Sequence, residues 1–222
     1  MDTYTTMVKF FQEGGLFMYP IAIVLALGLS IAIERWVYLT LTTAKNKAVW
    51  NAVTPHLKAG NLAGAVQVTS KSGAAIGQIM TYGLNRVRSA RRREDVEQAM
   101  EESLMEVMPR LEKRTHYLAT FANIATLLGL LGTIVGLISA FTAVASANPA
   151  EKADLLSASI SVAMNTTAFG LIVAIPLLLV HKLLQTKTTE IIDSLEMASV
   201  KFLNTITERA AADAKTAAKA AG

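Results

Sequence analysis

The sequence contains no cysteine, which excludes disulfide bonds, iron–sulfur clusters and zinc sites built from thiolates. Charge is also scarce, because only 17% of the 222 residues are Asp, Glu, Lys or Arg, whereas 52% are hydrophobic. Uncharged stretches cover residues 14–33, 115–150 and 155–181. Each of them reaches the length of roughly 20 residues that a helix needs to cross a bilayer. The sequence therefore predicts an integral membrane protein with three transmembrane helices.

The positive charges gather in two regions of the chain. Nearly all of its 21 Lys and Arg residues lie between Arg35 and Arg114 or from Lys182 onward. Positively charged segments stay on the cytoplasmic side of a membrane, so the middle segment and the C-terminus are expected there and the N-terminus outside. The basic run 91–93 could contact membrane lipids, although a solvated face is the simpler interpretation. The net charge of +4 thus reflects topology, and no nucleic-acid partner is expected.

These patterns divide the chain into segments. We expect an N-terminal interfacial arm (1–13), transmembrane helix 1 (14–38), a cytoplasmic helical domain (39–114), transmembrane helix 2 (115–145), an external turn (146–154), transmembrane helix 3 (155–181), a cytoplasmic helix (182–209) and a disordered tail (210–222). The first span is expected to be retained, because its apolar run of about 20 residues exceeds the core of a cleaved signal peptide. Residues 40–90 carry helix punctuation at Pro55 and Gly60 and suggest several short helices.

Apolar residues recur at helical spacing on the cytoplasmic side of two spans. The first series is Val96, Met100, Leu104, Val107 and Leu111; the second is Leu184, Thr188, Ile191, Leu195, Ala198, Phe202 and Ile206. This spacing predicts amphipathic helices that continue straight into the second span and out of the third. A seam of this kind needs a partner helix, from the same chain or an identical one. The expected fold is therefore an all-α membrane protein with three transmembrane helices, two of them extended into the cytoplasm, in a homo-oligomeric bundle.

The three spans lack any Asp, Glu, Lys or Arg between their flanking charges. Ionisable residues usually mark proton relays in membranes. If this chain handles protons, we therefore expect a second subunit to supply the carboxylate. The sequence also shows no paired nucleophile and base, no phosphate-binding loop and no cluster of metal ligands. We expect neither an enzyme nor a bound cofactor or metal.

Small and hydroxyl-bearing residues interrupt the second and third spans where leucine would insert more favourably. They are Gly129, Gly132, Thr133 and Gly136 in the second span, and Ala163, Asn165, Thr166, Thr167, Gly170 and Ala174 in the third. Small residues allow two helices to approach closely, and hydroxyls can bond the preceding turn. The same residues could instead line a polar path. The spacing by itself leaves helix packing and ion conduction equally open.

Other polar residues near the spans give weaker signals. His116 and His181 lie near the expected cytoplasmic edge and could shuttle protons, although interfacial packing or solvation explains them more simply. His56 has no neighbouring set of metal ligands. Pro176 could kink the third span.

Two segments carry a family resemblance. GLLGTIVGLISAF at 129–141 and NTTAFGLIVAIP at 165–176 resemble the MotA/TolQ/ExbB proton channel family. The order of one span, a large basic segment and two further spans is similar to the ExbB and TolQ branch, whereas MotA-like stator subunits have four spans.

The resemblance implies a channel-forming subunit of an ion-driven motor in the bacterial inner membrane. It implies a homopentamer around an ExbD- or TolR-like single-span subunit whose membrane aspartate carries protons. The proton-motive force would then drive mechanical work on a periplasmic or outer-membrane partner, such as a TonB system. On this template, Thr133 and Thr167 match the pore threonines of the family.

One position departs from the branch. ExbB and TolQ proteins carry a glutamate five residues before the third-span threonine, where this chain has Val162. Asn165 and Thr166 also replace apolar residues, and a tandem threonine is similar to sodium-driven stators. A sodium-coupled motor and a non-conducting structural scaffold therefore remain the alternatives to a proton-driven motor.

Overall fold

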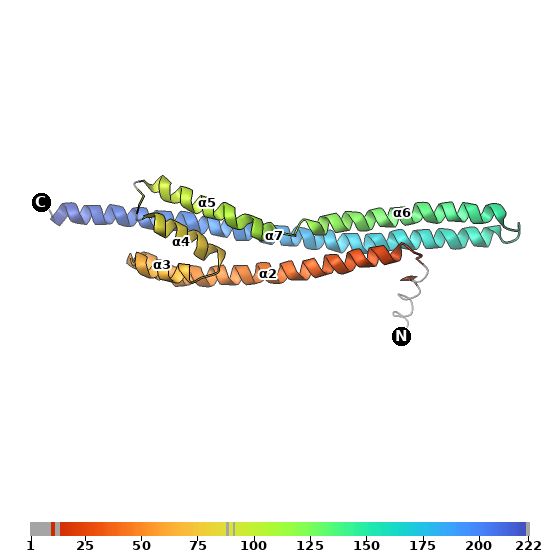
Figure 1. The fold of residues 1–222 in the computed structure, drawn as a ribbon, viewed down its shortest axis with the longest axis horizontal. Coiled ribbons are helices and arrows are strands. Elements are labelled where there is room, and N and C mark those ends of the chain that lie inside the picture. The colour runs from red at the N-terminus through yellow and green to blue at the C-terminus, as the bar shows by residue number, and fades with distance from the viewer. Residues whose placement is uncertain (1–9, 12–13, 88, 91, 221–222) are drawn as a thin grey trace. The chain divides into compact units, whose positions relative to one another are not determined.

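The computed structural model describes residues 10–11, 14–87, 89–90 and 92–220, and these residues form helices without any β-strand. In chain order the helices are α2 (Met18–Ala59), α3 (Leu62–Ser70), α4 (Ala75–Val87), α5 (Arg93–Glu112), α6 (Tyr117–Ser146) and α7 (Lys152–Ala220) (Figure 1). Three stretches, in α2, in α5–α6 and in α7, are long and apolar enough to cross a membrane. The predicted all-α class and the three spans are confirmed.

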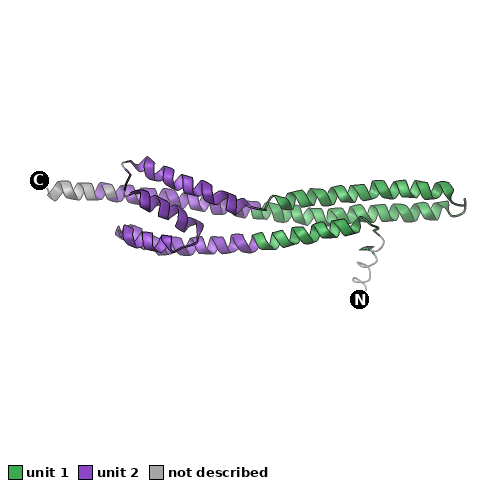
Figure 2. Ribbon diagram, in the orientation of Figure 1, with its two compact units in different colours: residues 1–35, 114–184 green, residues 36–113, 185–222 purple. Residues whose placement is uncertain are grey.

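The chain divides into two compact units. Unit 1 contains residues 1–35 and 114–184, and unit 2 contains residues 36–113 and 185–222 (Figure 2). Helices α2 and α7 each begin in unit 1 and continue into unit 2, whereas α6 belongs entirely to unit 1. Unit 1 therefore holds the uncharged stretches, and unit 2 holds the charged helices α3, α4 and α5.

Unit 1 is built around the hairpin of α6 and the first part of α7. The inner face of α6 is made of small residues: Ala122, Ala125, Gly129, Gly132 and Ala140 are all buried. Large apolar side chains lie on the outer faces and are exposed, among them Leu127, Ile138, Phe141, Ile172 and Leu179. In a membrane protein, an exposed apolar surface of this kind faces lipid or other helices.

Unit 2 buries the apolar seams that the sequence predicts. The whole series in α5 is buried, as are Thr188, Ile191, Leu195, Ala198 and Phe202 of α7. Their partner helices come from the same chain. At Gly83 of α4, an added Cβ atom would lie 2.7 Å from the Met100 sulfur and 3.1 Å from the Phe202 ring. The three helices thus pack closely around this glycine.

Two helix boundaries differ from the expectations. Pro55 lies inside α2, which ends only before Gly60, where a φ of 71° in the left-handed region stops the helix. The prediction of one helix running straight into the second span is wrong, because α5 ends at Glu112 and α6 begins at Tyr117. Between them, Arg114 has a φ of 65°, and its guanidinium forms an ion pair with Glu34 at 3.2 Å.

Helix α7 passes through Pro176 and is assigned as far as Ala220. Most side chains of the predicted tail, 210–222, lie outside the described residues, as does most of the predicted arm, 1–13. The predicted domain boundaries in these regions stay predictions.

Candidate functional site

The backbones of α6 and α7 touch at two glycines. A Cβ atom added at Gly129 would lie 3.2 Å from Thr167 Cα and 3.4 Å from Gly170 Cα. A Cβ atom added at Gly170 would lie 2.7 Å from the carbonyl oxygen of Ala125. The contact at Gly170 leaves no room for a side chain, and the contact at Gly129 is tighter than ordinary van der Waals packing, so both positions favour glycine where the helices pack closely.

The same seam continues toward the 146–152 turn. A Cβ atom added at Gly136 would lie 2.8 Å from the Cβ atom of Ala163. One added at Gly132 would collide with the Thr166 side chain, whose Cβ atom would be 3.0 Å away. Ala174, farther along α7, is also buried. At these positions the two helices lie too close for a water-filled path between them.

Thr167 joins the two helices through its hydroxyl. The half-buried side chain donates a hydrogen bond of 2.8 Å to the carbonyl oxygen of Gly129. A carbonyl oxygen has two lone pairs, so Gly129 can accept this bond in addition to one within its own helix. The bond places a polar atom of α7 at the edge of the glycine contact.

Thr133 has a different local partner. Its hydroxyl donates to the carbonyl of Leu130 in the same helix at 2.6 Å, and the side chain is half-buried. This bond satisfies the hydroxyl proton within α6 and leaves the oxygen lone pairs as acceptors. Thr133 and Thr167 therefore both present partly accessible hydroxyl oxygens on the hairpin.

Thr166 is more deeply buried than Thr133 and Thr167 and is only 2% exposed. Its hydroxyl lies 2.6 Å from the carbonyl oxygen of Gly14 and 2.9 Å from that of Val162. One hydroxyl has one proton to donate, so the two carbonyls share it. Gly14 precedes Gly15, whose φ of 74° turns the chain before α2 begins. Thr166 thus attaches this bend to α7.

Residues 71–197, more than half of the chain, match the MotA/TolQ/ExbB proton channel family. The chain belongs to this family. An ExbB homolog of Methanothermobacter thermautotrophicus is 28% identical over 199 residues, which cover 89% of this chain and 69% of the relative. A Synechocystis ExbB-like protein is 29% identical over 178 residues, covering 78% and 68%.

A shorter match links the chain to TolQ. The Tol-Pal system protein TolQ of Haemophilus influenzae is 35% identical over 81 residues, covering 36% of this chain and 35% of TolQ. These relatives place the chain in the ExbB and TolQ branch. The family is one of channels and transport proteins, and the chain is accordingly a multi-pass membrane subunit of the biopolymer-transport motor type.

Asn165 and Val162 lie beside the threonines in α7. Both side chains are half-buried, and the Asn165 amide has no hydrogen-bond partner among the described residues. Val162 faces the bend before α2, because a Cβ atom added at Gly15 would lie 3.0 Å from its side chain. The Val162 side chain therefore packs against the bend of its own chain.

The histidines lie away from the threonines. His116 is exposed at the start of α6, its ring 4.8 Å from that of Tyr117, and His181 is half-buried. Among the described residues, no group of three or more His, Cys, Asp or Glu side chains could hold a metal ion, so His56 has no ligand set.

The bond between Thr166 and Gly14 could not have been found from the sequence. Its two residues are 152 positions apart, and no sequence motif links them. Aromatic side chains also join the N-terminal segment to α7. Phe10 and Phe11 lie edge-on to Phe169, with ring centres 6.4 and 5.9 Å apart, respectively.

We expect Thr166→Val to loosen the segment before α2 without unfolding the hairpin. The change removes a buried hydrogen bond, which contributes about 1 kcal/mol. Hydrogen exchange should show faster exchange of the amides around residues 14–18 in this variant. Thr166→Ser keeps the hydroxyl and serves as the matched control. Equal protection in the valine and wild-type proteins would contradict the attachment.

Proposed function

We propose that this chain is the channel-forming subunit of a motor driven by the proton-motive force. It would assemble as a homo-oligomer, expected to be a pentamer, around an ExbD- or TolR-like single-span subunit with a membrane aspartate. The assembly would lie in a bacterial inner membrane, with the N-terminus periplasmic and the C-terminus cytoplasmic. It would transmit work to a periplasmic or outer-membrane partner such as a TonB-like protein.

The observation that carries this proposal is a pair of half-buried threonines on a hairpin whose two spans contain no charged residue. Thr133 and Thr167 are half-buried, and the uncharged stretches 115–150 and 155–181 surround them. A hydroxyl can pass or orient a proton but cannot hold a charge at neutral pH, so a carboxylate must come from elsewhere. This need fits the acidic single-span partner.

The close contact of α6 and α7 restricts where ions can pass. The glycine seam leaves no space between the two helices of one copy. The path would therefore run along the outside of the hairpin, where it meets the partner helix or the next copy. In this proposal Thr133 and Thr167 would face such a path, whereas Gly129, Gly132, Gly136 and Gly170 would hold the wall together.

Proton coupling fits the structure better than sodium coupling. The sodium alternative rests on the tandem threonine, but the Thr166 hydroxyl is buried against Gly14 and Val162. It thus acts as an attachment point rather than as a second ligand beside Thr167. Flux measured with sodium as the only gradient should be absent, and sodium-driven flux would favour the alternative.

A non-conducting scaffold is the second candidate, because the tightly packed seam would serve a scaffold equally well. Reconstitution in liposomes separates the two. The purified chain would be combined with an ExbD- or TolR-like single-span protein from the same organism, and an imposed proton gradient would be followed with an internal pH dye. Proton flux that depends on the partner aspartate supports the motor, and silence of a correctly assembled complex supports the scaffold.

We expect Thr133→Val to reduce this flux without abolishing it. Its hydroxyl bonds only within α6, so valine removes an acceptor from the path but no contact between helices. Thr133→Ser keeps the acceptor and should conduct like the wild type. The measurement is the initial rate of pH change per assembled complex. An unchanged rate in the valine variant would remove Thr133 from the path.

A further inference from the structure

Unit 2 contains a pocket between α2, α4 and α7, with a volume of about 320 Å³. Its walls are mainly apolar and include Trp50, Ile76 and Met197. Two exposed lysines, Lys47 of α2 and Lys201 of α7, lie at its rim. Among the described residues neither lysine has an ion-pair partner. The apolar walls and basic rim of the pocket thus fit a ligand that carries an acidic group beside an apolar one.

Helix α5 presents such groups on a face that the described residues of its own chain leave exposed. Glu97, Glu101 and Met105 follow one another at intervals of four residues and are all exposed, Met105 by 61%. Residues at this spacing share one side of a helix. We call them the acidic stripe. Like the lysines, Glu97 and Glu101 have no ion-pair partner among the described residues.

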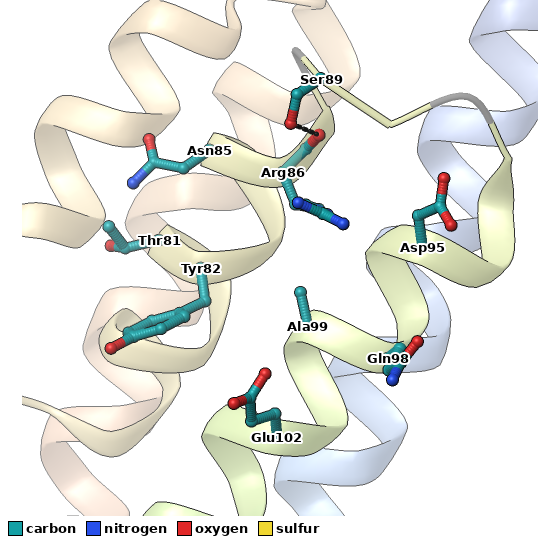
Figure 3. A pocket seen from close by; sticks show the side chains of 9 residues that line it. All are labelled: Thr81, Tyr82, Asn85, Arg86, Ser89, Asp95, Gln98, Ala99 and Glu102. Atoms are coloured by element: carbon teal, nitrogen blue, oxygen red, sulfur yellow. Dashed lines mark hydrogen bonds between the residues drawn. The ribbon is translucent and has the colours of Figure 1, made fainter.

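The acidic stripe is separate from the side of α5 that faces α4. Figure 3 shows Asp95, Gln98 and Glu102 of α5 beside Tyr82 and Arg86 of α4, around a cavity of about 580 Å³. Residues 97 and 101 are each about 100° around the helix from residues 98 and 102. The stripe therefore remains available to another molecule.

The pocket and the acidic stripe also lie at the same level along the helices of unit 2. Helix α5 leads into unit 1 and α7 comes out of it, so the two helices run in opposite directions through unit 2, and Arg93 of α5 bonds Asn204 of α7 at 2.9 Å. One turn along α5, Glu97 is level with Lys201. A further turn brings Glu101 level with Met197, which lines the pocket together with Lys47.

We propose that the acidic stripe of a second copy of this chain fills the pocket, with Glu97 pairing with Lys201 and Glu101 with Lys47. This proposal rests on the oligomer of the proposed function. Copies in a closed ring around the membrane normal keep the same height, so only groups at one level can meet. Opposite charges at matching levels fix the register of such a contact, and Met105 adds an apolar group beside them.

The absence of native cysteine allows a direct test by cysteine cross-linking. Glu97→Cys and Lys201→Cys would be made separately in the full-length chain, given different tags and expressed together. Treatment of the membranes with a short bifunctional maleimide should then join the two tags in one covalent dimer, because a Glu–Lys pair holds its Cα atoms farther apart than the roughly 4.4–6.8 Å that a disulfide spans. Mixing single variants ensures that any mixed-tag product joins two chains. A double variant should give a ladder of larger products.

The matched control replaces Glu97→Cys with Met105→Cys, which lies on the same stripe but about 12 Å out of level with Lys201. It should give far less mixed-tag dimer than Glu97→Cys. The oligomer would be checked in parallel by native mass spectrometry. An intact oligomer without the 97–201 product would overturn this interface, as would an equal product from the control. Neither result would contradict the proposed motor function. A monomeric chain would overturn both, and cross-linking of Lys201→Cys to an unrelated protein would assign the pocket to that partner instead.

Discussion

Gly170→Leu is expected to prevent accumulation of the folded protein. A Cβ atom at this position would lie 2.7 Å from the carbonyl oxygen of Ala125 and 3.2 Å from Gly129 Cα. Both neighbours are backbone atoms and cannot rotate away, so α6 and α7 would have to separate. Overpacking of a well-filled interior costs about 1–3 kcal/mol or more, and a clash with backbone lies at the upper end. We expect a loss of about tenfold or more in folded, detergent-extracted protein.

Ala168→Leu is the matched control for this experiment. Ala168 lies two residues earlier in the same helix, but its side chain is exposed, so the larger group meets no backbone. Gly132→Leu should be intermediate, because the added group would meet the side chain of Thr166 rather than backbone. Size-exclusion chromatography and a thermal unfolding assay would rank the three variants. Equal yields of Gly170→Leu and Ala168→Leu would disprove the close seam.

The second large effect is expected from Thr167→Val, which should abolish ion flux while the protein still assembles. Valine has nearly the shape of threonine, so it removes only the hydroxyl bond to Gly129, about 1 kcal/mol of stability. The tight glycine contacts remain. The path, however, loses the hydroxyl of α7 that lies at the edge of the seam. Proton flux in liposomes should fall to the level of liposomes without the chain.

Thr126→Val provides the control for threonine loss in general. The Thr126 hydroxyl bonds the Ala122 carbonyl in its own helix at 3.1 Å, and the side chain is exposed on α6. This variant should conduct normally, and Thr167→Ser should recover flux. Thermal unfolding and native mass spectrometry would show whether assembly is intact. Normal flux in an assembled Thr167→Val complex would reject the assignment of Thr167 to the path.

The sequence predicted some features of the structure well because they depend on residues close together in the chain. Missing charge marks the three spans, and the spacing of Val96, Met100 and Leu104 marks the buried side of α5. The break at Arg114 was missed, since the apolar pattern continues on both sides of it. A left-handed conformation at an arginine is not visible in hydrophobic spacing.

The sequence by itself determined the membrane class, the helical seams and the small residues available for close packing, because solvation and helical periodicity act on neighbouring residues. Tertiary structure decided which carbonyl oxygen each of the two consecutive threonines bonds. Thr166 and Thr167 point about 100° apart on α7, so one reaches Gly14 and the other Gly129. Those carbonyls come from distant parts of the chain, and only folding brings them within the reach of a hydroxyl.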